Sequence, residues 1–129
     1  MLKDKQILII DDTPSIRTFL RISLQTQRAV LYEAGSFKTG VETFNQIHPD
    51  LVVLDLGLPD KDGLEILPIV KNNEKKPIVI VLTVRKEPHI KAKAYQLGAD
   101  AYITKPFIMD DLMEVIHEKL KLSPNNMAV

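Results

Sequence analysis

The sequence predicts an α/β domain with a mostly parallel sheet. Three apolar runs, at 7–10, 51–54 and 78–82, are short, rich in β-branched residues and uninterrupted by polar ones. Such runs are typical of strands that are buried on both faces of a parallel sheet. The segments between the runs have apolar residues three and four positions apart, which indicates amphipathic helices. Strand and helix therefore alternate along the chain, as in a doubly wound α/β fold.

Two weaker strand candidates, 29–33 and 101–104, bring the expected strand–helix units to five. The last helix has an acidic start and a basic end, which suits the helix dipole. Gly98 is placed to close the fourth helix, expected near 88–97. The apolar positions that indicate the five helices are, in chain order, Ile16, Phe19, Leu20 and Leu24; Val41, Phe44 and Ile47; Leu64, Leu67 and Val70; Ile90, Ala94 and Leu97; and Leu112, Val115, Ile116 and Leu120.

The amino-acid composition excludes several classes of function. Of 129 residues, 45% are apolar and 26% charged, so we expect one globular domain over 1–122 and a flexible tail over 123–129. The absence of cysteine excludes disulfides and thiolate chemistry. Basic and acidic residues balance at 17 each, so direct nucleic-acid binding is not expected. No apolar run is long enough to span a membrane or to form a secretory signal, and we expect a cytoplasmic location.

Five polar residues stand where the predicted strands end. Asp11 and Asp12 follow the first strand, Asp55 the third, Thr83 the fourth and Lys105 the fifth. Ligands of open α/β sheets gather at this edge of the sheet. Crowded carboxylates repel one another, and Mg²⁺ relieves that repulsion while it also binds phosphate oxygens. The lysine and the threonine suit a transferred phosphoryl group, and Asp55 suits the nucleophile that forms an acyl phosphate.

Each of these residues also has a simpler interpretation. Asp12 could cap the helix that has Pro14 in its first turn, and Asp55 could begin a turn. Thr83 could be an ordinary strand-end residue and Lys105 an exposed charge. The joint placement of all five at one edge favours a shared site.

Four motifs carry a resemblance to a known family. They are 7–12 (ILIIDD), 51–63 (LVVLDLGLPDKDG), 80–83 (IVLT) and 102–107 (YITKPF). Together they resemble the receiver domains of bacterial two-component response regulators, over about 5–122. The sequence around the third strand is most similar to receivers of OmpR/PhoB-type transcription regulators. The resemblance implies a chemotaxis-regulator-like, flavodoxin-like (βα)5 fold with strand order 2-1-3-4-5.

The same resemblance implies roles at the predicted site. Asp55 would be the phosphoacceptor, and Asp12, Asp55 and the backbone carbonyl of Gly57 would bind Mg²⁺ directly, with Asp11 helping through water. Lys105 would pair with a phosphate oxygen beside a cis bond to Pro106. Such a domain is a switch that catalyses only its own phosphorylation and dephosphorylation, and is not classed as an enzyme.

The resemblance also implies a switch and its partners. Thr83 would move toward the phosphate and Tyr102 would swing inward behind it, which changes the surface of the fourth helix, fifth strand and fifth helix. A tyrosine on an outer strand could equally be plain packing. The phosphoryl donor would be a sensor histidine kinase or phosphotransfer protein. The recipient would be a downstream target protein or an effector domain missing from this chain, and the phosphorylated form could dimerise.

Three departures from the family pattern stand out. Val84 replaces a small residue and could narrow access to Asp55. Ala101 and Val115 replace an aspartate and an arginine that DNA-binding members use in their active dimer. No effector domain follows, and a stand-alone receiver is slightly favoured over part of a longer regulator. Residues of the first helix are candidate kinase contacts, namely Ser15, Ile16, Thr18 and Phe19.

Two alternatives from other classes stay open. A pseudo-receiver would keep the fold and ignore phosphate, although such proteins usually lose one of the acidic or lysine positions, and this chain has all five. A haloacid-dehalogenase-like phosphatase would use Asp11 as its nucleophile. That family has a second aspartate two residues later, where this chain has Thr13.

Overall fold

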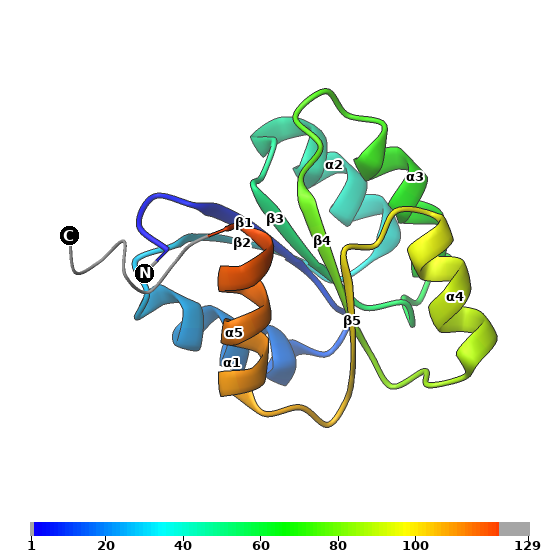
Figure 1. Ribbon diagram of the computed structural model, residues 1–129. Helices are drawn as coiled ribbons and strands as arrows, with labels where there is room; N and C mark the ends of the chain where they lie inside the picture. Colours follow the sequence, from blue (N-terminus) through cyan, green and yellow to red (C-terminus); the bar gives the residue numbers. More distant parts are fainter. Residues whose placement is uncertain (1, 122–129) are drawn as a thin grey trace.

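Strands and helices alternate along the chain and form three layers, with the sheet in the middle (Figure 1). The computed structural model describes residues 2–121, and the predicted tail at 123–129 lies outside them. The elements are β1 (Gln6–Ile10), α1 (Pro14–Gln25), β2 (Val30–Ala34), α2 (Phe37–Ile47), β3 (Leu51–Leu54), the 3-10 helix η1 (Gly63–Glu65), α3 (Ile66–Lys71), β4 (Ile78–Thr83), α4 (Pro88–Gln96), β5 (Ala101–Thr104) and α5 (Met109–Lys119).

The sheet confirms the predicted topology. Its strands are all parallel and lie in the order β2-β1-β3-β4-β5. Ile10 at the end of β1 pairs with Leu54 at the end of β3, and Leu54 pairs with Val81 of β4. The residues that follow β1 and β3 therefore emerge side by side at one edge of the sheet. This register brings Asp11 and Asp55 together.

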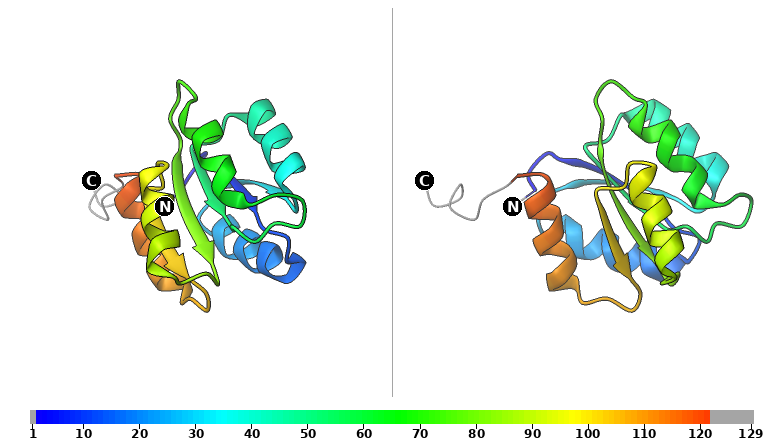
Figure 2. Two further views of the ribbon diagram at one scale, coloured as in Figure 1. Left: turned by 90° about the vertical axis from the view of Figure 1, so that its right-hand side faces the viewer. Right: turned by 45° about the vertical axis from the view of Figure 1, so that its right-hand side comes forward.

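Both faces of the sheet are buried, which explains why the strand sequences do not alternate with polar residues. Leu8 and Ile10 point into a core shared with α2, α3 and α4, whereas Ile7 and Ile9 point into a core shared with α1 and α5. The right-hand view of Figure 2 shows the sheet between these two groups of helices. Two apolar layers of this kind make the sheet a rigid base for the loops at its edges.

The strands lie within one residue of their expected boundaries. β2 begins and ends one residue later than predicted. The third helical segment begins as η1, because the carboxylate of Asp62 accepts a hydrogen bond from the amide of Leu64 and starts a tight turn. Gly98 closes α4 with a φ of +114°, a conformation that favours glycine.

Over residues 2–121, the helices are all too short or too polar to cross a membrane.

Candidate functional site

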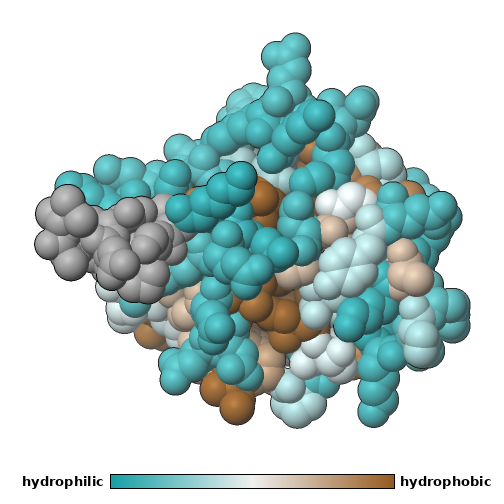
Figure 3. Space-filling model, in the orientation of Figure 1, coloured by the Kyte–Doolittle hydropathy of each residue, from teal (hydrophilic) through white to brown (hydrophobic). Residues whose placement is uncertain are grey.

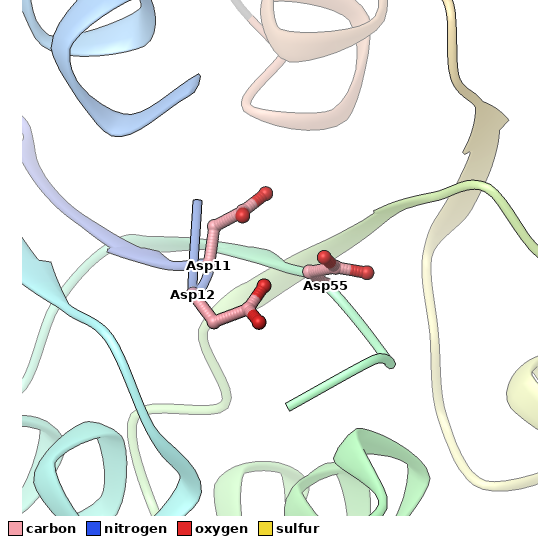
Figure 4. Close-up of side chains that lie close together, drawn as sticks. All are labelled: Asp11, Asp12 and Asp55. Atoms are coloured by element: carbon pink, nitrogen blue, oxygen red, sulfur yellow. The ribbon is translucent and has the colours of Figure 1, made fainter. Parts of the chain in front are cut away.

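Three carboxylates converge at the carboxyl end of β1 and β3 (Figure 4). One oxygen each from Asp11, Asp12 and Asp55 lies within 4.8 Å of the others. Asp11 and Asp55 are buried, whereas Asp12 is exposed. The backbone produces this cluster, because the register of β1 and β3 places the residues after each strand next to one another.

Lys105 supplies the positive charge at this cluster. Its Nζ lies 2.7 Å from Oδ2 of Asp11 and 3.3 Å from Oδ2 of Asp55. The side chain is only 11% exposed, so the interpretation of Lys105 as an exposed charge is wrong. Burial works against the charged amine, but the hydrogen bond and charge of Asp11 and the charge of Asp55 outweigh it and raise the pKa of Lys105 above its usual value. The backbone amide of Lys105 donates to the carbonyl of Thr83, and its peptide bond to Pro106 is cis.

Asp11 and Asp55 accept more hydrogen bonds than Asp12 does. Oδ1 of Asp11 accepts from the amide of Thr13 at 2.9 Å, and its Oδ2 faces Lys105. Oδ1 of Asp55 accepts from the amide of Gly57 at 3.1 Å. Asp12 has only a 3.5 Å contact with the hydroxyl of Thr13. Helix α1 takes Thr13 as its N-cap residue and has no side-chain cap, so a capping role for Asp12 is wrong.

The donor set fits a hard divalent cation. The cluster of three carboxylates has one lysine, which pairs with Asp11 and Asp55, so a surplus of negative charge and oxygen ligands remains for Mg²⁺. Asp12 is the carboxylate with the fewest protein contacts. The backbone at Gly57 is open, because a Cβ added there would meet only Oδ1 of Asp55, at 3.9 Å. Asp12, Asp55 and the carbonyl of Gly57 are therefore available to hold the cation.

Thr83 and Tyr102 meet at the loop after β4. Thr83 is fully buried, and its Oγ1 accepts from the amide of Arg85 at 3.4 Å. The hydroxyl of Tyr102 donates to the carbonyl of Arg85 at 2.7 Å. Burial and the nearby charge of Glu87 raise the pKa of Tyr102. In this state both hydroxyls contact the loop backbone, and Tyr102 also packs against the core shared with α2, α3 and α4.

Two residues that the sequence reasoning did not assign to the site support its backbone. Nη1 of Arg17 donates to the carbonyl of Asp11 at 2.6 Å, and Nε of Arg17 pairs with Glu33 on β2. Gly63 packs against Asp55, since a Cβ at Gly63 would lie 2.5 Å from the Asp55 carbonyl oxygen. The turn cluster after β3 signals a need for glycine, but no sequence spacing points to Arg17.

The loop after β3 is tied down at its other end by Asp60. Its carboxylate accepts from the amides of Phe37 at 2.8 Å and Lys38 at 3.0 Å, at the start of α2. These backbone donors hold the pKa of Asp60 below its usual value. Lys61 lies over the ring of Phe37. The loop that contains Gly57 is thus fastened to α2, which limits the motion of a proposed metal ligand.

An apolar pocket borders the carboxylates. Val84 is 68% exposed on its rim, and the rings of Phe19 and Phe107 lie 6.1 Å apart. The pocket has a volume of about 380 Å³ and is lined by Ile16, Phe19, Val84, Lys105, Pro106 and Phe107. Two of the predicted kinase contacts, Ile16 and Phe19, therefore lie beside Lys105.

Known proteins are similar to this chain in sequence. Residues 7–117 match the family described as the response regulator receiver domain. The chain is 37% identical over 115 residues to the KDP operon transcriptional regulatory protein KdpE of Escherichia coli, covering 89% of this chain and 51% of that protein. It is 34% identical over 116 residues to the chemotaxis protein CheY of Halobacterium salinarum, covering 90% and 97%. The chain thus spans about half the length of KdpE and nearly all of that CheY.

Solved structures with a similar fold are also receiver domains. A CheY-like receiver domain protein from Methanospirillum hungatei matches with a TM-score of 0.88 at 29% identity, covering 92% of this chain and 95% of that one. The BeF3-activated receiver domain of DrrB matches with a TM-score of 0.80 at 29% identity, covering 92% and 98%. The chain therefore belongs to the response-regulator receiver domains of two-component signalling systems.

Proposed function

We propose that Asp55 accepts a phosphoryl group from a phosphohistidine of a sensor histidine kinase or phosphotransfer protein. The observation that carries the proposal is the cluster of three carboxylates, two of which, Asp11 and Asp55, pair with the largely buried Lys105. A carboxylate oxygen of Asp55 forms a bond to phosphorus as the phosphorus–nitrogen bond of the donor breaks. The imidazole leaves with that electron pair and takes up a proton. The chain catalyses this transfer, and the later hydrolysis, on itself.

The residues around Asp55 take complementary roles. Asp12, Asp55 and the carbonyl of Gly57 hold Mg²⁺, with Asp11 nearby, and the cation supplies charge neutralisation for the phosphoryl oxygens. Lys105 pairs with a phosphoryl oxygen, and its raised pKa keeps it charged throughout the physiological range. Thr83 ends β4 at the same edge and turns its hydroxyl toward the phosphoryl group.

The output surface is formed by α4, β5 and α5. Tyr102 on β5 leaves the loop carbonyl and swings inward when Thr83 moves, and this shift changes the surface that a downstream target protein or an effector domain contacts. Figure 3 shows apolar surface between α4 and α5 with hydrophilic surface around it. Such a patch is typical of an interaction site.

The same surface offers a mode of dimerisation in the phosphorylated form. Lys91 and Lys93 on α4 are exposed and basic, whereas Asp110, Asp111 and Glu114 on α5 are exposed and acidic. Packing α4 of one copy against α5 of another pairs opposite charges.

The donor docks beside the apolar pocket. Ile16 and Phe19 line it from α1, and the exposed Val84 lines it from the loop after β4. The bulk of Val84 narrows the approach to Asp55 and slows both phosphorylation by small donors and hydrolysis. Val84→Ala is expected to accelerate both reactions, and equal rates for the two proteins would show that Val84 has no such role.

The proposal includes the bounds of the domain and its cellular location. Residues 1–122 act as the receiver unit, and the chain works in the cytoplasm, where ATP-dependent kinases form their phosphohistidine.

A phosphatase that uses Asp11 as nucleophile is disfavoured, because that family has a second aspartate two residues after the nucleophile, where this chain has Thr13. A pseudo-receiver is disfavoured because the acidic cluster and Lys105 are assembled.

The direct test is the intact mass after incubation with Mg²⁺ and acetyl phosphate or phosphoramidate. The wild-type protein is expected to gain one phosphoryl group, and Asp55→Asn to gain none. Asp60→Asn is the matched control, since Asp60 lies on the same loop but caps α2, and it is expected to be phosphorylated. Equal labelling of wild type and Asp55→Asn would overturn the assignment of Asp55.

A further inference from the structure

An ion pair connects the two loops that flank Asp55. Nη1 of Arg85, in the loop after β4, lies 3.3 Å and 3.2 Å from the two carboxylate oxygens of Asp62, in the loop after β3. The two side chains are 34% and 40% exposed, so the pair is partly shielded from solvent. It therefore joins the segment next to the phosphoacceptor to the segment next to Thr83.

The Asp62 end of this pair is fixed. Oδ1 of Asp62 also accepts from the amide of Leu64 at 3.0 Å, which starts η1. The backbone of Asp62 forms an antiparallel bridge with Gly57, and Asp60 fastens the same loop to α2. Motion between the two loops must therefore come mainly from the Arg85 side.

The Arg85 end contacts both proposed switch residues through its backbone. Its amide approaches Oγ1 of Thr83 at 3.4 Å, and its carbonyl accepts the hydroxyl of Tyr102 at 2.7 Å. A displacement of the Arg85 backbone would release Tyr102 and free Thr83. The guanidinium of the same residue is the group that Asp62 holds, so the ion pair restrains this displacement.

We propose that Asp62 and Arg85 are positioning residues that hold Thr83 and Tyr102 in the phosphate-free arrangement. The inference rests on the proposed function of Asp55, Thr83 and Tyr102. Because a ligand on Asp55 must shift Thr83 and Tyr102 against this restraint, weakening the ion pair increases the population of the switched state. A phosphoryl-like ligand then binds more tightly, while Mg²⁺ alone binds as before.

The test uses beryllofluoride, whose BeF3 unit on an aspartate carboxylate stands in for the phosphoryl group. The protein is titrated at saturating Mg²⁺ and followed by the amide NMR signals of Thr83 and Arg85. Asp62→Asn and Arg85→Gln are each expected to lower the half-saturating concentration about two- to five-fold, the range for a partly exposed ion pair. Asp62→Asn keeps an oxygen for the amide of Leu64, and thermal unfolding of each variant verifies its fold.

Two controls and a double variant separate the ion pair from general charge effects. Glu65→Gln in η1 and Lys86→Gln in the loop after β4 change exposed charges near the pair and are expected to bind beryllofluoride as wild type does. The Asp62→Asn/Arg85→Gln double variant is expected to gain no more than either single variant, because one interaction is lost in all three. A gain in the controls, or additive gains in the double variant, would overturn the proposal.

The effect of Asp62→Asn should depend on the Tyr102 hydroxyl, whereas a purely structural ion pair would show no such dependence. In a Tyr102→Phe background the hydroxyl that donates to the carbonyl of Arg85 is absent, so Asp62→Asn is expected to have a smaller effect than in wild type. Unchanged or weaker beryllofluoride binding by Asp62→Asn and Arg85→Gln, in the presence of normal wild-type binding, would refute the positioning role. Failure of the wild-type protein itself to bind beryllofluoride with Mg²⁺ would instead refute the proposed function.

Discussion

The two ends of the sheet use the same residue types in opposite ways. At the amino end, Asp50 accepts from the amide of Gln6 at 2.8 Å and pairs with Lys75 at 3.1 Å. Asp100 does the same with the amide of Val79 and the Nζ of Lys71. Each of these carboxylates has a lysine of its own. At the carboxyl end, a cluster of three carboxylates has one lysine, Lys105, which pairs with two of them.

This difference in charge balance distinguishes carboxylates that stabilise the sheet from carboxylates that form a binding site. A paired carboxylate at the end of a strand satisfies a backbone amide and holds the sheet together. A cluster with surplus charge costs stability and is retained where a cation or a phosphoryl group needs it. The number of strand-end aspartates should therefore be compared with the number of lysines that pair with them before a role is assigned.

The largest expected effect concerns the backbone beneath the site. A Cβ at Gly63 would lie 2.5 Å from the carbonyl oxygen of Asp55 and 2.7 Å from Cα of Leu56, so Gly63→Ala must displace the segment that carries Asp55. We expect a loss of about 1 to 3 kcal/mol in the free energy of unfolding. Urea unfolding measures it, with Gly57→Ala as control because its Cβ would have only a 3.9 Å contact. Equal stabilities of the two variants would show that Gly63 is not tightly packed.

A smaller loss is expected at the amino end. Burial opposes the charge of Asp50, but the amide of Gln6 and the charge of Lys75 outweigh it and hold its pKa below 3.8. A lowered pKa contributes stability above pH 3.8, and this contribution is lost as the pH falls through the folded-state value. Asp50→Asn should therefore lower the free energy of unfolding by about 1 kcal/mol at neutral pH and by less in acid.

Urea unfolding of Asp50→Asn from pH 7 to pH 3 measures this dependence. Glu74→Gln provides the control, because it removes an exposed acidic charge near Lys75. A deficit for Asp50→Asn that stays constant across the whole pH range would contradict the linkage to its carboxylate.

The smallest expected effect has the opposite sign. Asp12→Asn removes one of three repelling carboxylates, so in Mg²⁺-free buffer of low salt we expect about 0.5 kcal/mol of added stability. Thermal unfolding with and without Mg²⁺ measures this change. Mg²⁺ should stabilise the wild-type protein and have little effect on the variant, because binding to the folded state shifts the unfolding equilibrium. Destabilisation of Asp12→Asn without Mg²⁺ would mean that the carboxyl end has no surplus of charge.

The fold was predictable because the relevant information is local. Buried parallel strands read as uninterrupted apolar runs, and right-handed crossovers then restrict the topology. The outer strand β2 was less well defined, since Val30 is 40% exposed and the strand lacks an uninterrupted apolar run. The 3-10 turn η1 at the start of the third helical segment was not predicted, because the hydrogen bond from the amide of Leu64 to the carboxylate of Asp62 is a side-chain effect.

The site was predictable to the extent that strand ends define it. Asp11, Asp55 and Lys105 could be placed at one edge before any distance was known. Arg17 and Arg85 could not, because long side chains reach partners that no spacing identifies. The same limit applies to Lys75 and Lys71, whose pairing with Asp50 and Asp100 makes the amino end neutral.

The most direct measurement is a Mg²⁺ titration of the wild-type protein followed by amide NMR, which samples both ends of the sheet in one experiment. Saturable shifts are expected at Asp12, Asp55 and Gly57, with no saturable change at Asp50 or Asp100. Asp55→Asn should weaken the binding that these shifts report. Absence of saturable shifts at the carboxyl end, or equal shifts at both ends, would contradict the claim that surplus carboxylates form the cation site.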